Sequence, residues 1–98
     1  MKMTKTQNGG SLTIALQGRL DTTTAPELEK ELLSSLDDAT ELTLDFSELD
    51  YISSAGLRVL LSAHKAMSGK GGMKVTQANE IVKEVFEVTG FADILTVE

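Results

Sequence analysis

The chain has 98 residues, of which 41% are hydrophobic and 24% charged, a balance typical of one globular domain covering residues 1–98. The net charge of −6 and the scattered Lys and Arg residues argue against nucleic-acid binding. The lack of cysteine excludes disulfides, thiol catalysis and thiolate metal sites. No run of 18 apolar residues and no signal-peptide core is present, so we expect a cytoplasmic protein without a membrane segment.

Two strands are expected at the start of the chain. Leu12, Ile14 and Leu16 alternate with polar or small residues, which is the period of a half-buried strand. The sequence NGG precedes them, and Asn-Gly tolerates the positive φ angles of tight hairpin turns. Residues 1–6 are therefore expected to pair with residues 12–17 as a hairpin.

A helix and a strand follow. The segment DTTTAPELEKELLSSL opens with several capping residues and has Pro26 early in the helix. Its apolar stripe consists of Ala25, Leu28, Leu32 and Leu36, with Leu33 beside it. The sequence DDAT ends the helix, and residues 42–46 then alternate as a second clear strand.

The second half of the chain repeats the alternation of helix and strand. Residues 54–67 favour a helix that ends at SGKGG, and Met73 and Val75 mark the next strand. Asn79 is expected to cap a third helix that ends at Gly90. The apolar side of that helix is expected to contain Ile81, Val82, Val85 and Phe86. The last residues, ADILTVE, form a short strand or an extended tail.

The expected order of elements is β-β-α-β-α-β-α, with a possible last β. Strands that alternate with helices favour an α/β fold with a mixed sheet, parallel wherever a helix makes the crossover.

Catalytic and metal sites find little support. His64, the only histidine, lies ten residues beyond Ser54 on the same expected helix, which places the two about 15 Å apart along the axis. His64 also falls inside an apolar arc, so it receives no chemical role. SGKGG lacks the spacing of a phosphate-binding loop, and Asp37 and Asp38 are more simply a solvated loop. No cofactor is expected.

The helix over residues 54–67 has an unusual distribution of side chains. Arg58, Ser62 and Lys65 share a narrow polar strip, and apolar residues cover a much wider arc. Two interpretations are equally open: the core wraps this helix, or part of the arc meets a partner.

Two adjacent serines stand at the start of that helix. Ser53 is suited to cap the helix, which leaves Ser54 without an obvious structural role. A helix N-terminus presents free N–H groups and the positive end of the helix dipole, so it tolerates a phosphate on Ser54. Such a phosphate adds about −1.5 to −2 charges and would disrupt a closely packed interface.

Three segments resemble a known family. LTLDFSELDYISSAGLRVLL resembles the central motif of bacterial anti-sigma-factor antagonists of the STAS class, and LQGRLDTTTAPEL resembles their strand-to-first-helix motif. VFEVTGFADIL resembles the last helix of the family and its exit, so the resemblance covers nearly the whole chain. It implies a STAS-like single domain, a mixed sheet with helices packed mainly on one face.

The resemblance also implies site residues. In this family a serine before a small residue and Gly-Leu accepts phosphate, which assigns the role to Ser54. Ser53 is the alternative, because it stands where the family often has Asp, while Ala55 replaces a frequent Ser or Thr. Asp21 matches an acidic residue near the acceptor. The implied partner-binding residues are Asp21, Thr22, Ser53, Ser54, Ala55, Gly56, Leu57 and Arg58.

The mechanism that the resemblance implies is partner switching. The unphosphorylated protein binds an anti-sigma serine kinase and frees the sigma factor, the kinase phosphorylates Ser54, and a metal-dependent serine phosphatase restores binding. The protein would then be a ligand and substrate, not an enzyme, with neither nucleic acid nor membrane as a partner. The alternative is a STAS accessory subunit of a lipid-transport or signalling complex with no phosphorylation cycle. A small hydrolase is a third hypothesis, but its serine lacks a base.

Overall fold

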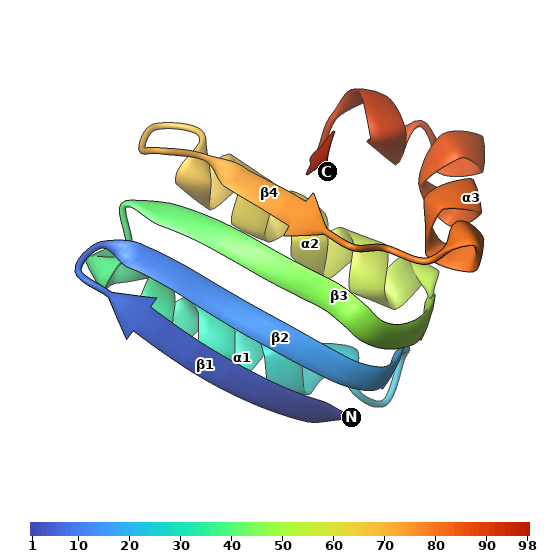
Figure 1. Cartoon of the computed structure of the whole chain (residues 1–98), viewed down its shortest axis with the longest axis horizontal. Coiled ribbons are helices and arrows are strands. Elements are labelled where there is room, and N and C mark those ends of the chain that lie inside the picture. The colour runs from blue at the N-terminus through green and yellow to red at the C-terminus, as the bar shows by residue number, and fades with distance from the viewer.

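The computed structural model describes residues 1–98 and contains a five-stranded sheet with three α-helices (Figure 1). The elements in chain order are β1 (Lys2–Asn8), β2 (Ser11–Leu20), α1 (Ala25–Ser35), β3 (Glu41–Ile52), α2 (Ser54–Met67), β4 (Met73–Thr76), α3 (Glu80–Thr89) and β5 (Thr96–Val97). Short 3-10 turns follow α1 (Leu36–Asp38) and α3 (Phe91–Asp93). The expected order of strands and helices is confirmed, and the last segment is a two-residue strand.

The strands lie in the sheet in the same order as in the chain. β1 pairs with β2 antiparallel through the expected hairpin, whose turn contains Gly9 at a φ of 65°. The other neighbouring strands are parallel, and each parallel pair is joined by one helix. The mixed sheet with helical crossovers is therefore confirmed.

The helices α1 and α2 cover one face of the sheet, and no helix covers the other (Figure 1). The alternation of β2 follows from this asymmetry, since Leu12, Ile14 and Leu16 are buried while Thr13 and Ala15 on the other face are only half-buried. α3 lies beside the end of the sheet at which β3 finishes. None of the helices combines the length and the apolar character needed to span a bilayer.

Two apolar residues lie outside the core, contrary to the expectation from the pattern. Leu33 is 75% exposed, because the groove that it borders is lined on the α2 side mostly by the short side chains of Ser62, Ala63 and Ala66, with Val59 beside them. Ile81 is 57% exposed, because Val82 and Phe86, the buried residues of α3, point about 100–140° away from it around the helix. Assigning these two residues to the buried faces was wrong.

β3 is longer than the alternating pattern indicated. It continues to Ile52, and its pairing with β2 slips by one residue at two places, so that β3 carries two bulges. The buried residues Phe46, Leu49 and Ile52 are consequently three positions apart instead of two. With the two bulges, Ile52 at the end of β3 pairs with Leu20 at the end of β2, and Ser53 N donates to Leu20 O at 2.9 Å.

Candidate functional site

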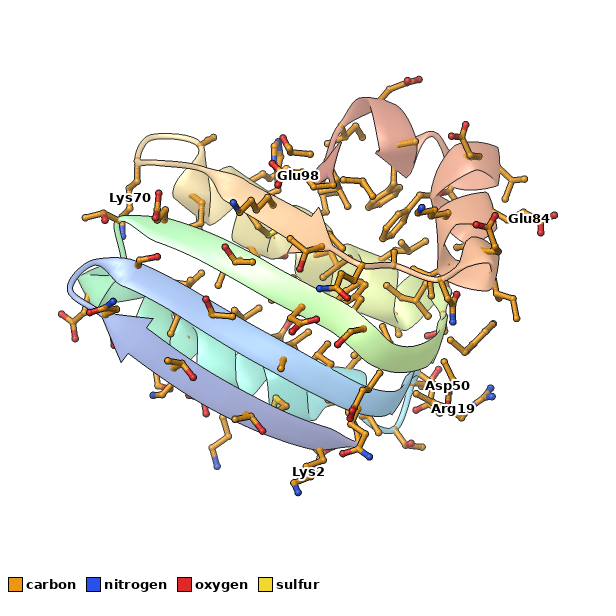
Figure 2. All side chains as sticks on the ribbon, viewed as in Figure 1. Lys2, Arg19, Asp50, Lys70, Glu84 and Glu98 are labelled. Atoms are coloured by element: carbon orange, nitrogen blue, oxygen red, sulfur yellow. The ribbon has the colours of Figure 1, made fainter.

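The residues of interest gather at one end of the sheet, where β2 and β3 finish and α1 and α2 begin. We call this region, residues 19–24 and 50–58, the Ser54 end. Figure 2 shows Arg19 and Asp50 together there. The carboxyl ends of the parallel strands β2 and β3 and the N-termini of α1 and α2 therefore meet at this end of the sheet.

The two adjacent serines have different structural roles. Ser53 is the N-cap of α2, with extended backbone angles and an Oγ that accepts a hydrogen bond from Gly56 N at 3.4 Å. Ser54 is the first residue of the helix, and its side chain is exposed. The cap of α2 is therefore complete without Ser54, whose hydroxyl makes no hydrogen bond in the structure.

Two residues of the serine motif lie on the buried face of α2 instead of on the surface. Gly56 and Leu57 are both buried. A Cβ added at Gly56 would lie 2.8 Å from Leu20 Cγ and 2.9 Å from Ile52 Cγ1, closer than real Cβ contacts. The glycine therefore lets the first turn of α2 sit directly on β2 and β3, which fixes the position of the exposed Ser54.

Asp21 stabilises the loop that leads into α1 through side-chain hydrogen bonds. Its Oδ1 accepts hydrogen bonds from Thr23 N at 3.0 Å, Thr24 N at 3.1 Å and Thr23 Oγ1 at 2.8 Å. The Thr23 hydroxyl, helped by these backbone N–H groups, holds the pKa of Asp21 below its usual range, against a smaller opposing effect of desolvation. Asp21 thus shapes the loop as well as lying at the Ser54 end.

The two arginines of the Ser54 end have different surroundings. Arg19 Nε lies 3.8 Å from Asp21 Oδ2, and the guanidinium carbon lies 4.6 Å from the centroid of the Tyr51 ring. Arg58 is exposed and borders a hollow of about 210 Å³ between α1 and α2. The other residues that line this hollow are Thr22, Ala25, Pro26, Glu29, Ala55 and Val59.

Asn79 is a positioning residue that the sequence identified only in part. It caps α3 as expected, since its Oδ1 accepts from Val82 N at 2.8 Å. Its amide nitrogen also donates to Leu49 O at 3.0 Å and to Asp50 O at 3.4 Å. Asn79 therefore ties the start of α3 to the end of β3, three to five residues before the serines.

The burial of the α2 side chains shows how much of its wide apolar arc the core covers. The core covers most of that arc, because Val59, Leu60, Ala63 and Met67 are buried. The polar strip of Arg58, Ser62 and Lys65 is exposed as expected, and His64 is half-buried. No three His, Asp or Glu side chains come together in an arrangement that could hold a metal ion.

Comparisons with known proteins show the family to which the chain belongs. The family model described as "Mlab, STAS domain" matches residues 3–96. A Bordetella bronchiseptica protein with the provisional name anti-sigma factor antagonist BtrV is 40% identical over 99% of this chain and 85% of its own length.

Solved structures agree at the level of the fold. An anti-sigma factor antagonist from Mycobacterium paratuberculosis has a TM-score of 0.88 at 21% identity, over 98% of this chain and 83% of that one. The phosphorylated form of the Bacillus cell fate determinant SpoIIAA has a TM-score of 0.77 at 15% identity, over 99% of this chain and 91% of that one. The sequence and fold matches together show that this chain belongs to the STAS domain family.

Proposed function

We propose that this protein is an anti-sigma-factor antagonist that acts by partner switching, with Ser54 as the phosphoacceptor. The observation that carries the proposal is the division of roles between the two serines. Ser53 is used as the cap of α2, whereas Ser54 is exposed at the helix start with a free hydroxyl. The family membership and the 40% identical relative support the same function.

The proposed cycle depends on the exposed part of the Ser54 end. Asp21, Thr22, Ser54, Ala55 and Arg58 form the surface that meets an anti-sigma serine kinase. Ser53, as the N-cap, and the buried Gly56 and Leu57 hold the first turn of α2 in place. In the unphosphorylated state this surface binds the kinase, so that the sigma factor is free.

Phosphorylation then reverses the binding. The kinase transfers the γ-phosphoryl group of ATP to Ser54 Oγ, which loses its proton, and ADP leaves. The phosphate brings about −1.5 to −2 charges to a chain whose net charge is already −6. Like-charge repulsion and the cost of removing water from the phosphate then weaken the interface with the kinase. A metal-dependent serine phosphatase hydrolyses the phosphoserine and restores binding. This cycle places the protein in the cytoplasm, where the kinase has ATP.

The proposed role is that of ligand and substrate and not that of an enzyme. A serine nucleophile needs a base within hydrogen-bonding reach. The only histidine, His64, lies ten residues further along α2, about 15 Å from Ser54 along the axis. The proposal therefore assigns the chemistry to the kinase and the phosphatase.

The first experiment is intact-mass measurement of the protein from its native cells, with site mapping by fragmentation, before and after treatment with a serine phosphatase. We expect one removable phosphoryl group on Ser54. A phosphoryl group on Ser53 would move the acceptor by one residue, and an unmodified protein under growth and stress alike would contradict the cycle.

The second experiment compares partner capture by substituted proteins. Ser54→Asp places a negative charge at the acceptor, and we expect it to reduce capture of the kinase at least tenfold, whereas Ser54→Ala binds like the wild type. Ser62→Asp is the matched control, because Ser62 is an exposed serine two turns further along α2. A partner held equally by all four proteins would favour an accessory subunit without a phosphorylation cycle.

A further inference from the structure

The chain has only two arginines, and both lie at the Ser54 end. The sequence contains nine basic residues, and the seven lysines all fall outside residues 19–24 and 50–58. Arg19 ends up beside Tyr51 and Asp21, and Arg58 lies one turn after Ser54 on α2. Arginine differs from lysine in its planar fork of donors, which matches a phosphate with two parallel hydrogen bonds.

The two arginines are not equally available. Arg19 is already paired with Asp21 and stacked on Tyr51. The structure contains two further ion pairs, Lys5 with Glu31 and Lys74 with Glu98, so Arg58 has no anionic partner. Its exposed side chain is therefore the free cation nearest to Ser54 along the helix.

The spacing of Ser54 and Arg58 suits an intrahelical pair. Residues four apart on a helix face one another, with Cβ atoms about 5–6 Å apart, and the favourable orientation has the anion on the N-terminal side. Ser54 is on the N-terminal side and would carry the anion once phosphorylated. Resting on the proposed phosphorylation of Ser54, we propose that Arg58 is the intramolecular counter-ion of the phosphate.

This pairing changes how the switch works. In the unphosphorylated protein, Arg58 borders the hollow that also contains Thr22 and Ala55, two residues of the proposed partner surface. Pairing with the phosphate withdraws this cation from that surface. Phosphorylation then both adds an anion and removes a cation available to the partner. The chain already carries a net charge of −6, so an added phosphate gains from a nearby cation.

The test uses protein with phosphoserine inserted at position 54 during translation, so that no kinase is required. Phosphorus NMR titration measures the second pKa of the phosphate, which is about 6 for an unperturbed group. We expect this pKa to rise by about 0.5 in Arg58→Gln relative to the parent, the size of a weak exposed ion pair. Raising the salt concentration should shrink the difference.

Three further variants decide the assignment. Arg58→Lys should give an intermediate pKa, because lysine keeps the charge but loses the planar fork. Lys65→Ala, at the other end of the same polar strip, should leave the phosphate pKa unchanged. An unchanged pKa in Arg58→Gln overturns the proposal, as does a larger rise in Arg19→Gln. Because the phosphate is inserted, failure here leaves the proposed cycle standing, and absence of phosphate in native cells leaves this result standing.

Discussion

The starts of α1 and α2 lie side by side at the Ser54 end, and each must satisfy the free N–H groups of a first helical turn. In the loop before α1, Asp21 Oδ1 accepts hydrogen bonds from Thr23 and Thr24, while Thr24, the N-cap, makes no side-chain cap bond to the helix. At the start of α2, Ser53 supplies the single side-chain cap and Ser54 is left over. At α1 the hydroxyls of Thr23 and Thr24 take part in the hydrogen bonds that shape the helix start, whereas at α2 packing holds the first turn and the Ser54 hydroxyl stays unused.

The largest expected effect comes from breaking the packing of α2. In Gly56→Ala the new Cβ meets Leu20 and Ile52 at 2.8–2.9 Å, so we expect the free energy of unfolding to fall by about 1–3 kcal/mol. Urea unfolding measures this. Gly69→Ala is the control, since a Cβ there meets no atom within 4 Å and its φ is not positive. Equal losses in both variants would contradict the packing argument.

The next effect comes from removing the charge that organises the start of α1. The lowered pKa of Asp21 means that its carboxylate stabilises the folded state fully above the usual carboxyl range. This contribution is lost as the pH falls through the lowered folded pKa. We expect Asp21→Asn to be less stable than the wild type at pH 7, with a difference that closes on acidification.

A second pair of substitutions identifies the cause of the lowered pKa of Asp21. Thr23→Val removes the hydroxyl that lowers this pKa most. When Thr23→Val is present in both proteins, the loss of stability that Asp21→Asn causes at pH 7 should be smaller. Thr22→Val is the control, because the exposed Thr22 side chain makes no hydrogen bond. Thermal unfolding from pH 7 to pH 2 measures both, and a gap independent of pH would disprove the charge argument.

The smallest effects separate the two serines. Ser53→Ala removes the cap of α2 and should lower the free energy of unfolding by about 0.5–1 kcal/mol, the lower part of the range for caps because the bond is long. Ser54→Ala removes a hydroxyl without a partner and should change it by less than about 0.5 kcal/mol. If Ser54→Ala proves the more destabilising, the assignment of roles is reversed.

The sequence predicted the elements whose pattern is local. Leu12, Ile14 and Leu16 indicated β2 because a sheet covered on one face imposes strict alternation. The caps of α2 and α3 were likewise predictable, because a cap depends on residues only three positions apart. The position of Ser54 at the start of α2 followed from the same local logic.

What could not be predicted depends on contacts between distant segments. The bulges of β3 follow from its register against β2, and neither Ser47 nor Asp50 signals an extra residue on its own. The exposure of Leu33 depends on the short side chains that face it from α2. The donor role of Asn79 requires Leu49 to lie nearby, 30 residues earlier in the chain.

The sequential order of the strands has a consequence for synthesis. Because sheet neighbours are also chain neighbours, no strand has to insert between two that are already paired. A nascent chain can therefore add β1, β2 and β3 in the order in which the ribosome releases them. Asn79 is synthesised later, so its bonds to Leu49 and Asp50 form only after both serines have left the ribosome. We expect the region before Ser54 to become rigid last, when α3 docks.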